Sequence, residues 1–245
     1  DALVVDIAHG HSAYAVDTLR GIKRELGDVE VVAGNVATAR GALDLIKAGA
    51  DAVKVGVGSG SICVTRVVTG SGVPQLTAIM DSARGAADSD VPIIGDGGIR
   101  VPGDVTKALA AGASTVMVGS LFAGTEESPG PTILRDGARY KLTRGMASLT
   151  ASIDRRLREG SENNATENEL IEEVAEESVP EGVEGLIPYR GAVADVIRQL
   201  VGGLRSGMSY CGARNLRELR ARAEFIQITA AGYKESLPHD IEKVM

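Results

Sequence analysis

A cysteine at the end of a glycine-rich loop is the residue of this sequence best suited to chemistry. Cys63 follows Gly58-Ser-Gly-Ser-Ile62, and a hydroxyl follows two residues later at Thr65. Glycines at this density let the backbone adopt unusual angles and come close to a ligand. A thiol presented there predicts a nucleophile, although many free cysteines are small buried residues. The glycine-rich approach favours the nucleophile.

Two further glycine segments, Asp96-Gly97-Gly98 and Gly119-Ser120, follow other apolar runs. Asp-Gly-Gly by itself is typical of an ordinary tight turn. Together, however, the backbone N–H groups of the two segments could hold a phosphate. Asp96 could then accept hydrogen bonds from a ribose diol, so the sequence predicts a phosphorylated substrate with hydroxyl groups.

Two other candidates are weaker. His9 and His11 could ligate a metal, but no third ligand lies at a persuasive spacing, so a transition-metal site is not expected. Cys211 follows an amphipathic helix without a glycine-rich approach. We expect it to be structural.

Alternating strands and helices must position these residues. Apolar runs typical of buried strands occur at 2–6, 30–33, 52–57, 91–95 and 115–118, and helical patterns separate them at 14–26, 39–48, 75–87 and 103–111. This alternation predicts parallel β/α units. Polar residues follow every strand, as at the active-site face of a (β/α)8 TIM barrel. An open doubly wound sheet would tend to show one glycine fingerprint instead, so the predicted fold class is an α/β TIM barrel.

Five strands cannot close an eight-stranded barrel, and the sequence opens inside a strand at Asp1. We therefore expect residues 1–245 to be a C-terminal portion of the barrel, about strands 4 to 8. A genuine five-unit protein is less favoured because its parallel edges would stay open.

The second half of the sequence no longer shows the regular alternation of strands and helices. Residues 149–180 include a stretch rich in Glu, Asn and Arg that predicts either a mobile flap or a merely solvated insertion. An amphipathic helix is expected at 192–205, a strand-like run at 225–229, and a C-terminal tail at 232–245.

Composition excludes several classes of partner. The 245 residues are 44% hydrophobic, enough for one large core, and carry a net charge of -7 with 3% aromatic residues and no Trp. An acidic chain poor in aromatic residues is not expected to bind nucleic acid. With two cysteines, no leader and no apolar stretch long enough for a bilayer, the sequence predicts a cytoplasmic protein without a membrane partner.

The ordered motifs together resemble the inosine monophosphate dehydrogenase / guanosine monophosphate reductase family over nearly the whole chain. The resemblance is carried by Gly58-Ser-Gly-Ser-Ile-Cys-Val-Thr-Arg66, Gly95-Asp-Gly-Gly-Ile-Arg100, Val118-Gly-Ser-Leu-Phe-Ala-Gly-Thr-Glu-Glu127, Arg144-Gly-Met146 and Gly202-Gly-Leu-Arg-Ser206. The resemblance implies a (β/α)8 barrel. It also implies that Cys63 attacks C2 of inosine 5'-monophosphate, that NAD takes the hydride, and that water hydrolyses the thioimidate to xanthosine 5'-monophosphate.

The resemblance also assigns roles to individual residues. Cys63, Thr65 and Arg155 would be catalytic. The nucleotide would be held by Ser61, Asp96, Gly97, Gly98, Gly119, Ser120, Thr143, Arg144, Gly145, Met146, Ala147 and Glu181. The dinucleotide would face Asp6, Asn35, Gly56, Val57 and Gly58. A potassium ion would bind Gly58, Gly60 and Cys63, completed by Glu235, Ser236 and Leu237 of a neighbouring subunit, which implies a homotetramer.

Three activities are compatible with the resemblance. The family's reductases place a catalytic Glu where this sequence has Leu149, which favours the NAD-dependent dehydrogenase over an NADPH-dependent reductase. The family's flap carries an Arg-Tyr pair that activates water, whereas the nearest match here is Arg155-Arg156. That departure leaves a nucleotide-binding paralogue with impaired turnover as the third possibility.

Overall fold

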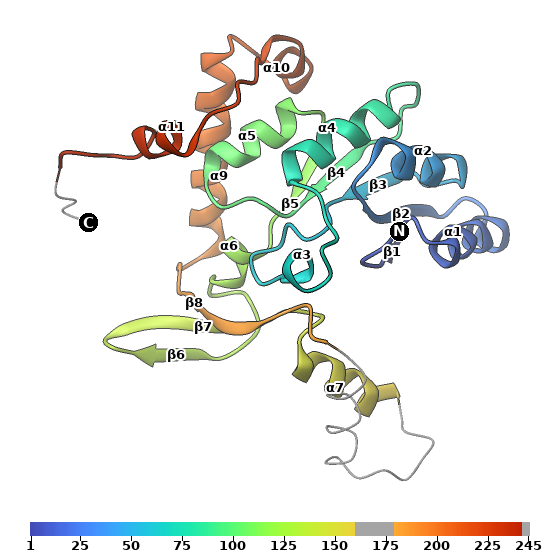
Figure 1. Ribbon diagram of the computed structural model, residues 1–245, viewed down its shortest axis with the longest axis horizontal. Helices are drawn as coiled ribbons and strands as arrows, with labels where there is room; N and C mark the ends of the chain where they lie inside the picture. Colours follow the sequence, from blue (N-terminus) through green and yellow to red (C-terminus); the bar gives the residue numbers. More distant parts are fainter. Residues whose placement is uncertain (160–178, 242–245) are drawn as a thin grey trace.

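The computed structural model describes residues 1–159 and 179–241, and a five-stranded parallel sheet forms its centre (Figure 1). The strands are β1 (Ala2–Asp6), β2 (Glu30–Val36), β3 (Ala52–Val55), β4 (Ile93–Asp96) and β5 (Thr115–Met117). They neighbour one another in chain order, and every pair is parallel. The α/β class with a parallel sheet is therefore confirmed, and each strand lies at or close to its predicted position.

A helix follows each of the first four strands: α1 (Ala13–Leu26), α2 (Ala39–Lys47), α4 (Gln75–Gly85) and α5 (Pro102–Ala110). Two short helices, α3 (Thr65–Val68) and α6 (Ser120–Ala123), lie in the loops after β3 and β5. Because such crossovers are right-handed, adding every strand in the same direction puts all the helices on one face of the sheet. This is the order of a β/α barrel, although β1 and β5 each pair with one strand only, and no closed barrel forms within the described residues.

Local sequence signals set the starts of these helices. The Ser12 hydroxyl accepts the N–H of Ala15 at 3.3 Å, and the Thr38 hydroxyl accepts that of Gly41 at 3.1 Å. Such caps satisfy backbone N–H groups that have no partner within a helix. Behind the caps, Leu19, Leu45 and Val53 are 0% exposed in the core between the helices and the sheet. The core thus holds the strands in register, and the register fixes where the strand ends point.

A second, antiparallel sheet was not predicted. It consists of β6 (Thr132–Arg135), β7 (Ala138–Arg144) and β8 (Glu184–Pro188), paired in that order. Asp136 and Gly137, with φ of 51° and 76°, form the tight turn between β6 and β7. Asp-Gly between apolar-alternating strands is a strong hairpin signal, so this element was detectable from the sequence.

The remaining helices are α7 (Leu149–Glu159), α9 (Val193–Tyr210), α10 (Leu216–Arg222) and α11 (Ala230–Glu235). Helix α9 confirms the amphipathic prediction and packs on α5, where Gly203 and Gly207 leave room for Pro102 and Thr106. The predicted strand at 225–229 is wrong: the segment pairs with no described strand, Ile226 is 84% exposed, and Thr229 caps α11. An apolar run without a neighbouring strand edge has no partner for its backbone groups.

The predicted flap is described only in part. Residues 149–159 form α7, while 160–178 lie outside the described residues, as do 242–245 of the predicted tail. Helix α7 projects below the antiparallel sheet in Figure 1. In the part of the chain that the structure describes, the helices are too short or too polar to cross a membrane. The flap, tail and single-domain boundaries stay predictions.

Candidate active site

The loop that follows β3 carries the thiol. Cys63 is half-buried, its N–H donates to the Gly60 carbonyl at 3.2 Å, and its thiol donates to Thr65 Oγ1 at 3.1 Å. Gly58 has a φ of 75°, and a Cβ there would lie 2.6 Å from Arg66 Cγ. Only glycine adopts this conformation readily while leaving room for Arg66. The glycines therefore shape the turn that presents Cys63 and Thr65.

Backbone hydrogen bonds attach the Cys63 loop to residues 181–183, which are in turn bonded to Ala147. Val64 N donates to the Glu181 carbonyl at 2.8 Å, and Val183 N donates to the Ile62 carbonyl at 2.9 Å. The N–H of Glu181 in turn donates to the Ala147 carbonyl at 3.1 Å. The predicted nucleotide residues around Met146 and Glu181 thus lie beside the thiol loop.

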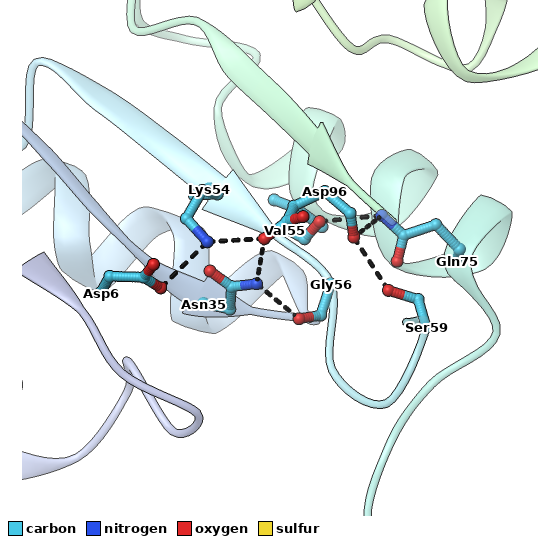
Figure 2. Close-up of polar contacts among 8 residues, drawn as sticks. All are labelled: Asp6, Asn35, Lys54, Val55, Gly56, Ser59, Gln75 and Asp96. Atoms are coloured by element: carbon cyan, nitrogen blue, oxygen red, sulfur yellow. Dashed lines mark hydrogen bonds and ion pairs between the residues drawn. The ribbon is translucent and has the colours of Figure 1, made fainter. Parts of the chain in front are cut away.

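A polar network crosses the carboxyl ends of four adjacent strands (Figure 2). Lys54 Nζ on β3 contacts Asp96 Oδ2 at 2.6 Å and Asp6 Oδ1 at 3.0 Å. Asn35 Nδ2 donates to the same Asp96 oxygen at 2.9 Å and to the Gly56 carbonyl at 2.7 Å. A buried ammonium is stabilised by paired carboxylates. The two predicted binding carboxylates are therefore joined through one lysine.

The backbone of Asp96 is held as firmly as its side chain. Its carbonyl accepts Ser59 Oγ at 2.8 Å and Gln75 Nε2 at 3.0 Å. Gln75 Nε2 also donates to the Val55 carbonyl at 2.8 Å. Gly56, with a φ of 150°, passes so close that a Cβ there would lie 2.2 Å from the Asp96 carbonyl oxygen. The ends of β3 and β4 are thus locked together at the site.

Two cavities adjoin at this edge of the sheet and share Gly58, Ser59, Gly60 and Gly97. One has a volume of about 410 Å³. Its lining includes the predicted catalytic and dinucleotide residues together with parts of the nucleotide set: Cys63, Thr65, Asp6, Asn35, Gly56, Val57, Gly58, Asp96, Gly97 and Met146. The other, of about 550 Å³, is lined among others by Ser61, Gly97, Gly98 and Ser120 from the predicted nucleotide set.

One carboxylate in the second cavity has a perturbed pKa. Burial of Asp104 opposes ionisation, but hydrogen bonds from Lys107 and from the backbone N–H of Arg100 outweigh burial and lower the pKa of the carboxyl group. Asp104 Oδ1 lies 2.9 Å from Lys107 Nζ. Arg100 Nε also lies 3.9 Å from Asp104 Oδ2, so two cations face this one carboxylate at this end of the cavity.

Several predicted site residues do not line either cavity. Gly119 directly precedes Ser120, whereas Thr143, Arg144, Gly145, Ala147 and Glu181 belong to the segments beside the Cys63 loop. Arg155 lies in α7, one residue after Asp154, whose carboxylate contacts Arg144 at 2.6 Å. Glu235, Ser236 and Leu237 lie at the end of α11, across α9 from the Cys63 loop in Figure 1. Their predicted roles are not tested by this placement.

Sequence reasoning assigned no role to Lys54, Ser59 or Gln75. Lys54 did carry a signal, because a lysine inside an otherwise apolar strand must find buried partners. Ser59 and Gln75 carried none, since their contacts with Asp96 depend on how β3 and α4 meet β4.

Known proteins resemble this chain over nearly its whole length. The family model for the IMP dehydrogenase / GMP reductase domain matches residues 1–239. The chain is 58% identical to an inosine-5'-monophosphate dehydrogenase of Nitrosopumilus maritimus over 98% of its length and 49% of the relative's. It is 50% identical to a GMP reductase of Leishmania donovani, over 100% of this chain and 48% of the relative.

A solved structure is similar as well. A crystal structure of a GMP reductase variant from Trypanosoma brucei in complex with guanosine 5'-monophosphate matches with a TM-score of 0.85 and 45% identity. The match covers 99% of this chain and 48% of that one. The chain thus spans about half the length of the relatives it matches.

Proposed function

The chain belongs to the IMP dehydrogenase / GMP reductase family, and we propose that it forms the thiol-bearing part of a cytoplasmic enzyme that oxidises inosine 5'-monophosphate with NAD. The observation that carries the proposal is that Cys63 and Thr65 line one cavity with Asp6 and Asp96. A thiol there can reach a base whose ribose is held by Asp96 while a second nucleotide lies near Asp6.

The reaction follows from thiol chemistry. The Cys63 thiolate adds to C2 of the purine, and the electron pair of the C2–N3 double bond moves onto N3. Expulsion of hydride from C2 restores the double bond and leaves a thioimidate on Cys63. Water then adds to C2, the C–S bond breaks, and Cys63 is released with xanthosine 5'-monophosphate. Thr65 Oγ1, 3.1 Å from the sulfur, accepts a hydrogen bond from the thiol and so orients Cys63 for the attack.

The geometry fits a dinucleotide beside the purine. Asp6 and Asn35 offer polar groups to the cavity, and Gly56 and Gly58 present bare backbone there. Asn35 Oδ1 is buried without a hydrogen-bond partner among the described residues, so it can accept a hydrogen bond from a ligand. When bound, the nicotinamide ring would supply the hydride acceptor.

A potassium ion fits the Cys63 loop by the chemistry of its carbonyl groups. No described backbone N–H donates to the Gly58 carbonyl or to the Cys63 carbonyl. The Gly60 carbonyl accepts the N–H of Cys63. Carbonyl oxygens of this kind suit a weakly hydrated cation. Glu235, Ser236 and Leu237 of a neighbouring copy would complete the site, since α11 lies away from the loop of its own chain. A site shared between copies requires an oligomer, and the resemblance implies that this oligomer is a homotetramer.

We also propose that the open sheet is a portion of a closed (β/α)8 barrel in the longer protein. The strand order is sequential, and the edge strands β1 and β5 each have one partner. Val4 on β1 is 57% exposed and Met117 on β5 is 44% exposed. Further βα units pairing with both edges would cover these apolar side chains and remove the open edges.

GMP reductase is the alternative activity, supported by the Leishmania donovani relative and by the Trypanosoma brucei structure. Leu149 stands at the position where, by the resemblance, the family's reductases have a catalytic Glu. This difference favours the dehydrogenase. The full-length protein should be incubated with inosine 5'-monophosphate, NAD and potassium. Steady formation of reduced cofactor, with a Cys63 adduct by mass spectrometry, supports the dehydrogenase.

Other results would change the assignment. Oxidation of NADPH with guanosine 5'-monophosphate, without turnover in the first assay, would establish the reductase. A burst of adduct without turnover would indicate the nucleotide-binding paralogue. A protein that forms no adduct and shows neither turnover is not the enzyme proposed.

A further inference from the structure

One buried cation serves both predicted binding carboxylates. The side chain of Lys54 is 3% exposed, and its ammonium lies 2.6 Å from Asp96 Oδ2 and 3.0 Å from Asp6 Oδ1. Asp6 ends β1 and Asp96 ends β4, so the two carboxylates come from strands separated by β2 and β3. Figure 2 shows Lys54 lying between them. The lysine is thus the physical link between the two sides of the cavity.

Strand β2 lies between Asp6 and Lys54, and a glycine in it leaves room for their contact. Asp6 pairs in register with Gly34, and Gly34 pairs with Lys54, so the three form one row across the sheet. A Cβ at position 34 would lie 2.7 Å from Lys54 Cβ and 2.5 Å from its carbonyl oxygen. Glycine is therefore required at the position that separates Lys54 from Asp6.

Each carboxylate keeps one oxygen for a ligand. Lys54 and Asn35 occupy Asp96 Oδ2, and Lys54 contacts Asp6 Oδ1. Among the described residues, Asp96 Oδ1 and Asp6 Oδ2 have no hydrogen bond or ion pair. A carboxylate can accept several hydrogen bonds, so both remain able to bind hydroxyl groups while Lys54 holds them in place.

The two carboxylates differ in how firmly they are held. Asp96 is 23% exposed and is also fixed by Asn35, whereas the side chain of Asp6 is 62% exposed and has Lys54 as its described ion-pair partner. Lys54 is buried and paired with Asp96, so a ligand that holds Asp96 would also hold Lys54 and, through it, the more exposed Asp6. The second ligand then loses less conformational freedom on binding, which makes the coupling favourable.

We propose that Lys54 is a positioning residue that couples occupancy of the nucleotide site at Asp96 to occupancy of the dinucleotide site at Asp6. The inference rests on the proposed function, because that function places the two ligands at these carboxylates. It adds a residue and a direction: inosine 5'-monophosphate on Asp96 tightens binding of NAD, and Lys54 carries that effect.

The test measures binding without chemistry. Full-length protein carrying Cys63→Ala is titrated calorimetrically with NAD, with and without saturating inosine 5'-monophosphate. We expect the nucleotide to tighten NAD binding about fivefold or more. Adding Lys54→Met should abolish that factor, whereas Lys54→Arg should retain part of it because the cation remains.

Two further variants separate coupling from folding. Lys141→Met removes another buried lysine, which is 4% exposed and donates to the Ser128 carbonyl outside the cavities. It should leave the coupling factor unchanged. Asp6→Asn weakens the ion pair between Lys54 and Asp6. Because Asp6 is exposed, this change leaves no cavity in the core. It should reduce the factor while leaving affinity for inosine 5'-monophosphate unchanged, and it decides the matter if Lys54→Met does not fold.

The outcomes separate failure of the Lys54 role from failure of the proposed function. Coupling that survives in Lys54→Met, or in Asp6→Asn where Lys54→Met is unfolded, overturns the role of Lys54. Binding of both ligands without any coupling in the Cys63→Ala protein also overturns it and leaves the proposed function standing. Failure to bind either ligand overturns both.

Discussion

The Cys63 thiol lies 3.1 Å from the Thr65 hydroxyl, and both side chains line the same cavity. The two residues are close in sequence, but the segments that hold their loop are distant from each other. The loop is held between the end of β3 and residues 181–183, which approach from β8. The reacting pair is therefore positioned by segments more than a hundred residues apart.

Thr65→Val removes the hydroxyl and keeps the shape of the side chain. A net hydrogen bond contributes about 0.5–1.5 kcal/mol, so we expect kcat to fall by about 3- to 10-fold with the Cys63 adduct forming more slowly. Stopped-flow absorbance of the reduced cofactor measures this. Thr69→Val is the matched control, because among the described residues the Thr69 hydroxyl is bonded to backbone groups of Thr65 and Ser71. Equal losses in both variants would mean a structural effect.

Arg155→Ala should separate the two half-reactions. If Arg155 activates water, the variant still transfers hydride and accumulates the Cys63 adduct, while steady-state turnover falls by about 10²- to 10⁴-fold. Rapid quench followed by mass spectrometry measures the adduct, and steady-state absorbance measures turnover. An unchanged steady state would show that another group activates water.

Gly56→Ala should disrupt the site from the backbone. Gly56 has a φ of 150°, and a Cβ there would lie 2.2 Å from the Asp96 carbonyl oxygen. We expect a loss of about 1–3 kcal/mol in the free energy of unfolding and weaker nucleotide binding, measured by chemical denaturation and calorimetry. Gly103→Ala is the control, because nothing lies within 4 Å of its Cβ and its φ is ordinary. Comparable losses in the two variants would contradict this explanation.

Asp51 should make stability depend on pH. Its Oδ2 accepts Lys23 Nζ at 2.8 Å and Val31 N at 2.7 Å, and these hydrogen bonds lower the carboxyl pKa below the usual 3.8. A lowered folded-state pKa contributes stability above the unfolded value, and this is lost as pH falls through the folded value. Because Asp51 is 42% exposed, Asp51→Asn should cost about 1 kcal/mol or less at pH 7.

The cost of Asp51→Asn should shrink as the pH falls below about 3.8, where the carboxyl group of the unfolded chain becomes protonated, and should disappear below the lower pKa of the folded state, where the native carboxylate is protonated too. Urea denaturation at several pH values measures it. Asp88→Asn, on an exposed position without a described hydrogen bond, should change stability little at any pH. A cost for Asp51→Asn that stays constant with pH would show that its charge is not responsible.

The fold was largely predictable because its signals are local. Short apolar strands, helix periodicity and capping residues such as Ser12 and Thr38 lie within a few residues of the elements they define. The hairpin turn at Asp136-Gly137 is a local signal of the same kind. One failure has a physical cause. The run at 225–229 had strand propensity but no strand edge to pair with, and pairing decides whether such a run becomes a strand.

The candidate site was predictable where its residues end a strand or lie in the loop that follows one. Asp6 and Asp96 are the last residues of β1 and β4, Cys63 lies in the loop after β3, and parallel strands bring their carboxyl ends to one edge of the sheet. Ser59 and Gln75, which hold the Asp96 carbonyl, could not be found in this way. Their contacts depend on the packing of a loop and a helix against β4.

By itself, the sequence determined the β/α alternation, the glycine loop before Cys63 and the family to which the chain belongs, because each depends on residue types at short, fixed spacings. Only the tertiary structure decided that Lys54 joins Asp6 to Asp96. That contact needs the register of four strands and the missing side chain at Gly34. A buried charge acquires its partners through space, and the order of residues along the chain does not specify them.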